Sequence, residues 1–275
     1  MSDDGEGRQV FLLTGCASGI GAFLARRLIE KGHQVVCTDV NQPGMQRWLS
    51  TCEGAPERSL CRLLDVRKPR AWDEVMEQAI EAFGQVDVVM NIAGFLRPGY
   101  AGGVTDEDVD LHLDINVKGV IYGTRAAAHH MSQRGCGHII NIGSLASLTP
   151  VPGLGLYAAS KFAVRGYSLS VAEDLRPHGI AVSVVLLDAV KTPMLDLQAD
   201  YEEAALTFSG PRPLTLEEVE HLIMDDVLIK RPLEVTLPRS RGMIARVAGV
   251  APELTKVLGP LLTRLGRRAQ AKYEA

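Results

Sequence analysis

Short apolar runs alternate with longer amphipathic segments along most of this chain of 275 residues. The runs have the length of buried parallel strands and fall at residues 10–14, 34–39, 59–64, 87–91, 138–143, 181–187 and 233–237. Helical periodicity follows the first run at 22–31, and Thr105-Asp-Glu-Asp108 resembles a capping box that opens another helix. This alternation predicts an α/β fold with a doubly wound parallel sheet of about seven strands. No repeat or linker interrupts it, so we expect a single domain over 1–275.

A glycine-rich turn follows the first apolar run. Gly15, Gly19 and Gly21 form a Gly-x-x-x-Gly-x-Gly pattern between the predicted strand and the helix at 22–31. Glycines permit a tight turn and let a pyrophosphate approach, and its charge then meets the free N–H groups at the helix start. Strand, glycine turn and helix follow in the order of a dinucleotide site. We therefore interpret the segment as a phosphate-binding turn rather than as a structural turn alone.

The second predicted strand ends in Asp39, about 20 residues beyond the glycines, where an acidic residue meets the ribose 2′-hydroxyl. Its carboxylate would accept a hydrogen bond from that hydroxyl and repel a 2′-phosphate. Position 40 is Val, and the glycine turn carries no basic residue for such a phosphate. The sequence therefore predicts NAD as the cofactor, the alternative being that Asp39 only caps a strand end.

Tyr157 and Lys161 are four residues apart at the start of a predicted helix, so both side chains leave the same face. An isolated tyrosine titrates near roughly 10, and a neighbouring ammonium is expected to lower that pKa. Such a pair supplies a proton donor and acceptor near neutral pH, and the hydroxyl of Ser144 would hold the substrate oxygen. Because Tyr-x-x-x-Lys occurs by chance in many helices, its weight depends on the nucleotide motifs before it.

With these residues in place, the chain resembles the short-chain dehydrogenase/reductase family from about residue 10 to residue 192. Asp65-Val66, Asn91-Ile-Ala-Gly94 (the family has Asn-Asn-Ala-Gly) and Asn116 add to the resemblance. It implies a Rossmann-type core at 8–192 and a catalytic set of Asn116, Ser144, Tyr157 and Lys161, with Asn116 supporting a proton relay. The residues it assigns to the cofactor are Gly15, Ser18, Gly19, Ile20, Gly21, Asp39, Asp65, Val66, Asn91, Ala93, Gly94, Tyr157, Lys161, Val190 and Thr192.

One motif departs from the family. Where the family has Pro-Gly-x-Val-x-Thr, this chain has Leu187 and Asp188 before Val190 and Thr192. Asp188 places a carboxylate where glycine leaves space. Either it points into the pocket and selects a polar substrate, or it turns to solvent, which is the interpretation we favour.

The sequence gives less information about the substrate-binding residues than about the cofactor-binding ones. Residues 193–230 are expected to form a lid whose apolar side chains indicate an apolar alcohol or ketone. The candidate substrate residues are Leu145, Val151, Leu154 and Asp188.

Residues 239–275 form a basic and apolar helical extension in this interpretation. Its basic residues could lie on anionic lipid while its leucines insert. The basic residues are Arg246, Lys256, Arg264, Arg267 and Arg268, and the leucines are Leu254, Leu258, Leu261, Leu262 and Leu265. The alternative, which we favour, is a helix pair that closes the pocket or contacts another subunit.

Composition narrows the class of protein. A net charge of −4 gives no general attraction to nucleic acid. Five cysteines without paired spacing indicate reduced thiols and no metal site, and the polar N-terminus lacks a secretory signal, so we expect a cytoplasmic protein. Residues 139–160 carry no charge, but Pro150, Pro152 and three glycines argue against a membrane span.

The leading functional prediction is an NAD-dependent oxidoreductase that interconverts a secondary alcohol and a ketone, with Tyr157 as general acid and base. A 3-oxoacyl-carrier reductase is an alternative, although Asp39 disfavours the NADPH that such steps usually use. A non-catalytic NAD-binding redox regulator is another, although it would not need Ser144, Tyr157 and Lys161. The resemblance further implies a homodimer or homotetramer.

Overall fold

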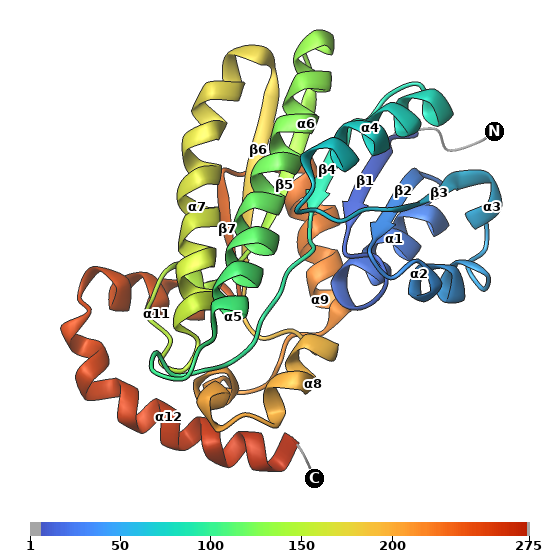
Figure 1. The fold of residues 1–275 in the computed structure, drawn as a ribbon. Coiled ribbons are helices and arrows are strands. Elements are labelled where there is room, and N and C mark those ends of the chain that lie inside the picture. The colour runs from blue at the N-terminus through green and yellow to red at the C-terminus, as the bar shows by residue number, and fades with distance from the viewer. Residues whose placement is uncertain (1–6, 274–275) are drawn as a thin grey trace.

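Seven parallel strands form one sheet in the order β3-β2-β1-β4-β5-β6-β7 (Figure 1). The computed structural model describes residues 7–273, without the side chains at 254, 255, 257 and 258. The strands are β1 (Val10–Thr14), β2 (Gln34–Asp39), β3 (Ser59–Leu63), β4 (Val88–Asn91), β5 (Gly137–Ser144), β6 (Ile180–Leu187) and β7 (Glu234–Leu237). All seven predicted strands are confirmed to within one residue at each end. The strand order reverses between β1 and β4, which opens a crevice at the carboxyl ends of the strands.

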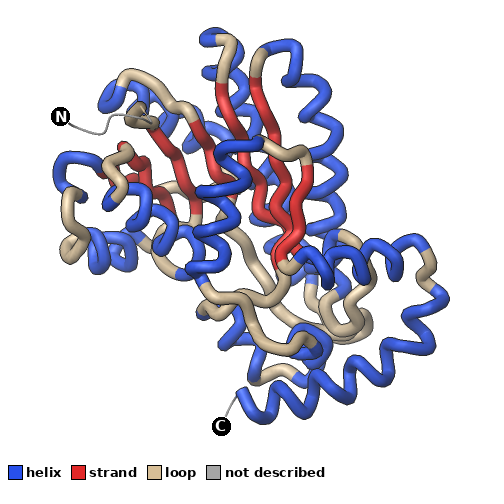
Figure 2. Tube along the Cα trace, turned by 180° about the vertical axis from the view of Figure 1, so that it is seen from behind, coloured by secondary structure: helices blue, strands red, loops and turns tan. Residues whose placement is uncertain are grey.

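Helices cover both faces of the sheet (Figures 1 and 2). In chain order the helices are α1 (Gly19–Glu30), α2 (Gln42–Leu49), α3 (Ala55–Arg58), α4 (Pro69–Phe83), α5 (Asp106–Leu111), the π-helix η1 (His112–Lys118), α6 (Gly119–Arg134), η2 (Leu145–Ser147), α7 (Gly155–Leu175), η3 (Arg176–His178), α8 (Pro193–Ala199), η4 (Glu202–Ser209), α9 (Leu216–His221), the π-helix η5 (Leu222–Val227), α10 (Leu228–Lys230), α11 (Arg239–Val250) and α12 (Glu253–Tyr273). The capping box is confirmed: Thr105 Oγ1 accepts the N–H of Asp108 at 3.1 Å, and Asp108 Oδ2 accepts that of Thr105 at 3.0 Å.

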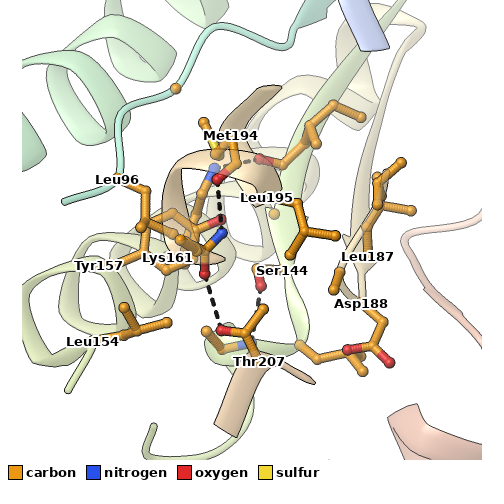
Figure 3. A pocket seen from close by; sticks show the side chains of 18 of the residues that line it. Leu96, Ser144, Leu154, Tyr157, Lys161, Leu187, Asp188, Met194, Leu195 and Thr207 are labelled. Atoms are coloured by element: carbon orange, nitrogen blue, oxygen red, sulfur yellow. Dashed lines mark hydrogen bonds between the residues drawn. The ribbon is translucent and has the colours of Figure 1, made fainter. Parts of the chain in front are cut away.

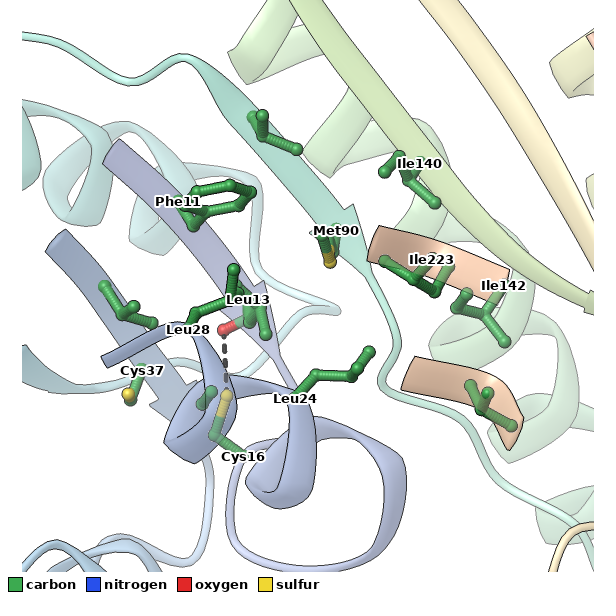
Figure 4. Close-up of a cluster of buried hydrophobic side chains, with 14 of the residues drawn as sticks. Phe11, Leu13, Cys16, Leu24, Leu28, Cys37, Met90, Ile140, Ile142 and Ile223 are labelled. Carbon is green, nitrogen blue, oxygen red and sulfur yellow. Dashed lines mark hydrogen bonds between the residues drawn. The ribbon is translucent and has the colours of Figure 1, made fainter. Parts of the chain in front are cut away.

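Alternating residues of each central strand supply two cores. Phe11 and Leu13 of β1 pack with Leu24 of α1 and Ile223 of η5 on one face (Figure 4). Leu12, the residue between them, packs on the other face with α4, α6 and α7. Because strand side chains point alternately to opposite faces, a short apolar run buried on both sides needs helices on both. This explains why the strands read as continuous apolar runs in the sequence.

The expected lid at 193–230 is wrong in its second half. Val219 and Ile223 are fully buried in the core that covers the sheet, so α9 and η5 are part of the scaffold. Only α8 and η4 remain beside the carboxyl ends of the strands. The part of the chain that could act as a lid is therefore shorter than predicted, because α9 and η5 are needed to cover the sheet.

The C-terminal extension forms two helices, as predicted, and α12 is packed closely on η4. A Cβ atom on Gly266 would lie 1.9 Å from the carbonyl oxygen of Ala205, so the helix backbone contacts the lid directly. Gln270 Nε2 donates to the carbonyl oxygens of Ala199 at 2.7 Å and Tyr201 at 2.8 Å. Within the described part of the chain, no helix combines the length and apolar character that crossing a bilayer requires.

Candidate active site

A cavity of about 890 Å³ lies at the carboxyl ends of the strands and extends from the glycine turn to α11 and α12. Of the predicted cofactor residues, all but Asn91 line it. Of the predicted catalytic residues, Ser144, Tyr157 and Lys161 line it, and Asn116 does not. All four predicted substrate residues line it as well: Leu145, Val151, Leu154 and Asp188.

The glycine turn has no room for a side chain at Gly15 or Gly21. Gly15 has a φ of +74°, and a Cβ atom on Gly21 would lie 2.2 Å from the carbonyl oxygen of Gly15. Thr14 Oγ1 accepts the N–H groups of Ile92 and Ala93, each at 2.9 Å, and so joins the ends of β1 and β4. This leaves an open, backbone-lined surface at the start of α1, which fits a pyrophosphate.

Asp39, the last residue of β2, lies beside the glycine turn. Its Oδ2 accepts the N–H of Ala17 at 2.9 Å and its Oδ1 accepts that of Asn41 at 2.8 Å, while the side chain lines the cavity. The carboxylate is therefore held in place by the glycine turn. Its fixed negative charge fits a ribose diol and opposes a 2′-phosphate.

Asp65 lines the cavity at the same end, beside a residue that sequence reasoning missed. Arg67 makes two bonds to it, Nε to Oδ1 and Nη2 to Oδ2, each at 2.8 Å. The hydrogen bond from the Arg67 side chain lowers the pKa of Asp65. The charge of Arg67 is thereby largely neutralised, although this residue also lines the cavity.

Asn91 does not take the predicted place against the cofactor. It is 3% exposed, and its Nδ2 donates to Asn141 Oδ1 at 2.8 Å, while Asn141 Nδ2 donates to Ser168 Oγ at 2.9 Å. Since Asn91 lies within β4, its side chain enters the layer between sheet and helices and links β4, β5 and α7. Its position makes it a structural residue.

Tyr157 and Lys161 both lie in the first two turns of α7, as the spacing predicts, and face Ser144 at the end of β5 (Figure 3). Lys161 is 4% exposed, its Nζ lies 5.6 Å from the centre of the Tyr157 ring, and it donates to the carbonyl oxygen of Ile142 at 2.9 Å. The side chains of Ser144 and Tyr157 line the same cavity. Three groups able to bind one oxygen atom thus converge beside the cofactor end of the cavity.

Burial controls the titration of this pair. It raises the pKa of Tyr157 to about 12, against a smaller lowering by the hydrogen bond from Ser144. Burial also lowers the pKa of Lys161 to about 8. The expected lowering of the Tyr157 pKa is therefore wrong, because removal of the phenol from water outweighs the opposing effect of Ser144.

Asn116 lies in η1, where the helix linking α5 to α6 widens for one turn. Its Nδ2 donates to the carbonyl oxygen of Phe95 and to Ser160 Oγ, each at 2.9 Å, and its Oδ1 accepts the N–H of Phe95 at 2.7 Å. The side chain thus joins the segment after β4 to the helix that carries Tyr157. Its proton-relay role stays a prediction.

Asp188 lies largely covered in the cavity wall, so the favoured expectation that it turns to solvent is wrong. The side chain is 14% exposed and forms an ion pair with Arg241 of α11. Burial raises the pKa of Asp188, and the charge of Arg241 opposes that rise. Sequence reasoning missed Arg241 because 53 positions separate it from Asp188 along the chain; only the pairing of β6 with β7 brings them together.

Most of the remaining wall at this end is apolar. It is lined by Leu96, Leu111, Ile115, Met194, Leu195, Leu206, Met243, Ile244, Val247 and Leu262. These residues come from the segments after β4 and β6 and from both C-terminal helices. Within residues 7–273, no group of three or more His, Cys, Asp or Glu side chains is arranged to hold a metal ion.

Comparison with known proteins adds to this geometry. A family model described as short chain dehydrogenase matches residues 9–202. An NADP-dependent 3-hydroxy acid dehydrogenase of Salmonella typhi is 35% identical over 222 residues, which cover 78% of this chain and 87% of that protein. A (2S)-[(R)-hydroxy(phenyl)methyl]succinyl-CoA dehydrogenase subunit of Thauera aromatica is 33% identical over 203 residues, or 74% and 82% of the two chains. The crystal structure of a short chain dehydrogenase/reductase from Burkholderia phymatum in complex with NAD has the same fold, with a TM-score of 0.80 at 24% identity over 90% of this chain and 95% of that one.

Proposed function

The chain belongs to the short-chain dehydrogenase family, and on this premise we propose that it interconverts a secondary alcohol and a ketone with NAD, using Tyr157 as general acid and base. The observation that carries the proposal is the convergence of Ser144, Tyr157 and Lys161 on one cavity that also contains the glycine turn and Asp39. A redox regulator without catalysis would not need such a proton-transfer set.

The residues present fit a nicotinamide dinucleotide. The backbone of the glycine turn would hold the pyrophosphate, Asp39 the adenosine ribose, Asp65 and Val66 the adenine, and Val190 and Thr192 the nicotinamide end. The bound cofactor would supply or accept the hydride. The remaining chemistry is proton transfer at the substrate oxygen, which belongs to the protein.

In the direction of reduction, Tyr157 is a phenol at neutral pH because its pKa is about 12. It would donate its proton to the substrate oxygen, which Ser144 holds. Lys161, charged below its pKa of about 8, would stabilise the phenolate that results. In oxidation the same phenolate would take the proton of the alcohol. Positioned acid–base catalysis of this kind is typically worth about 10² to 10⁴ in rate.

The preference for NAD rests on Asp39. A 2′-phosphate would meet its carboxylate, whose two oxygens are already oriented by backbone N–H groups. Val40 follows where a phosphate site would need a cation, and Arg67 is occupied by Asp65. The Salmonella relative is NADP-dependent by name, so the cofactor is to be measured rather than transferred from it.

The names of the two relatives favour a second candidate substrate. Both act on a molecule with a hydroxyl group and an acid or thioester function. A 3-hydroxy acid or its thioester is therefore the alternative to a simple apolar alcohol, and it includes the 3-oxoacyl-carrier reductase predicted as an alternative from the sequence. Arg241, which lines the cavity beside Asp188, would be the cation that receives the acid group.

The test is reduction of NAD or NADP over a panel of secondary alcohols, steroids, polyols, 3-hydroxy acids and their thioesters. We expect turnover with NAD in preference to NADP. Turnover restricted to NADP would overturn the role of Asp39, and tight NAD binding without turnover on any member would favour the regulator. Light scattering of the full chain checks the predicted homodimer or homotetramer.

A further inference from the structure

The outward face of α12 combines exposed leucines with basic residues. Leu261 and Leu265 are 56% and 46% exposed, one helical turn apart. Arg264 and Arg268 are exposed and lie between and beyond them on the same side of the helix, since residues three and four apart are neighbours on a helix surface. The opposite side of α12, including Gly266 and Gln270, is buried against the lid. The side chains of Leu254 and Leu258 lie outside the described set.

The basic residues of the two C-terminal helices differ in their partners. On α11, Arg239, Arg241 and Arg246 each pair with an acid, Asp226, Asp188 and Glu234 respectively. On α12, none of Arg264, Arg267, Arg268 and Lys272 has an ion-pair partner among the described residues. Residues 239–273 contain eight Arg or Lys and one Asp or Glu, in a chain whose net charge is −4. Positive charge is therefore concentrated at this end of the molecule.

The same region borders the open side of the cavity. Met243, Ile244 and Val247 of α11 line the cavity although they are 60%, 64% and 53% exposed. Leu262 of α12, next to Leu261, also lines it. Figures 1 and 2 show both helices along one end of the molecule, beyond the carboxyl ends of the strands. An apolar route thus leads from the exposed edge of α11 into the site.

We propose that the outer face of α12 and the exposed edge of α11 dock on an anionic lipid surface. The leucines enter the headgroup region while the unpaired arginines meet lipid phosphates and carboxylates, the arrangement of an interfacial amphipathic helix. The open side of the cavity then faces the membrane, from which an apolar substrate can enter without crossing water. A second copy of the chain fits less well, because two-fold pairing through this face would oppose the arginines of one α12 to those of the other.

The docking does not depend on the proposed reaction, so it is tested by binding alone. The full chain is sedimented with vesicles of phosphatidylcholine, with or without phosphatidylserine. We expect binding to the anionic vesicles only, and weakening of that binding as salt is raised from about 0.1 M to about 1 M, because the Debye length falls from roughly 10 to 3 Å.

Two pairs of variants locate the surface. R264Q/R267Q/R268Q should bind anionic vesicles about 100-fold more weakly, since each basic residue near such a membrane contributes about a factor of five. Its control, K31Q/R47Q/R70Q, makes the same change of charge at exposed positions just after α1 and on α2 and α4, and should bind as the wild type does. L261S/L265S should also lose binding, whereas L63S/I229S, which removes leucine and isoleucine exposed elsewhere, should not.

Absence of binding to anionic vesicles would overturn the proposal. Equal losses in both triple variants would do the same, because binding would then follow net charge and not this face. A fall in molecular mass for L261S/L265S, together with no vesicle binding by the wild type, would identify a second copy of the chain as the occupant. Activity in solution is measured separately, so failure of either proposal leaves the other standing.

Discussion

At the cofactor end of the cavity the wall comes from the segments after β1, β2, β3 and β4, and includes backbone, two acids and the arginine paired with one of them. At the substrate end it comes from residues spread between Leu96 and Leu262 and consists mainly of leucine, isoleucine, valine and methionine. The first end recognises charge and hydrogen bonds at fixed positions, so few residue types serve there. The second end recognises shape, which many combinations of apolar residues can provide. Variants at the two ends should therefore fail in different ways.

The largest expected effect is at Tyr157, where the two ends meet. Tyr157→Phe removes the proton donor and keeps the ring, so we expect kcat to fall by about 10² to 10⁴. NAD affinity, measured by calorimetry, should change little. Tyr100→Phe, at an exposed tyrosine outside the cavity lining, is the control. Substantial activity in the first variant would remove the acid–base role.

Asp39→Asn should change the choice of cofactor and leave the substrate range intact. Loss of a charge-assisted hydrogen bond, and of repulsion toward a 2′-phosphate, should shift the NAD/NADP ratio of kcat/KM by about 10 to 100-fold toward NADP. The asparagine keeps one oxygen as an acceptor for backbone N–H groups, which limits structural damage. Glu53→Gln, an exposed acid after α2, controls for net charge. An unchanged ratio would mean that the ribose is recognised elsewhere.

Asp188→Asn should act at the substrate end. It leaves Arg241 without its carboxylate, and because Arg241 is 27% exposed we expect a loss of only about 1 to 2 kcal/mol in the free energy of unfolding. Urea denaturation measures this loss, and D188N/R241Q should recover part of it.

Asp188→Asn should also change the KM for substrate, while the affinity for NAD stays the same. Arg246→Gln is the matched control, because it breaks the comparable pair with Glu234 on the same helix outside the cavity lining. Equal effects of D188N and R246Q on KM would show that the Asp188–Arg241 pair only holds α11 in place.

The smallest expected effect is on the pH profile of reduction. Lys161 has its pKa lowered to about 8, so its ammonium is present below that value and is lost as pH rises through it. The rate of ketone reduction should fall about threefold between half a pH unit below and half a unit above this pKa. Lys161→Arg keeps its charge over this range and should abolish the decline, whatever its absolute rate. A wild-type profile that is flat across pH 8 would contradict the role of the ammonium.

The cofactor end of the cavity could be predicted from the sequence because the residues that form it stand in short local motifs. Gly15 and Asp39 stand at the ends of short strands and Gly21 in the first turn of α1, and a turn of this kind has few solutions in backbone geometry. Tyr157 and Lys161 share a helix face through spacing alone. Asn91 is the exception, since its motif placed it near the cofactor and only the packing of β4 against β5 shows that its side chain points into the core.

By itself, the sequence determined the strand pattern, the order of the motifs and the helix face that Tyr157 and Lys161 share, because each depends on residues within one turn or one element. Only the tertiary structure decided that Asp188 lies in the cavity wall and pairs with Arg241. It also decided that residues 216–227 cover the sheet and that burial raises the pKa of Tyr157 to about 12. These outcomes depend on contacts between residues far apart in the chain and on the removal of water from them. Long-range contacts and burial cannot be predicted from local spacing, because the pairing of β6 with β7 and the packing of α12 on η4 exist only in the folded molecule.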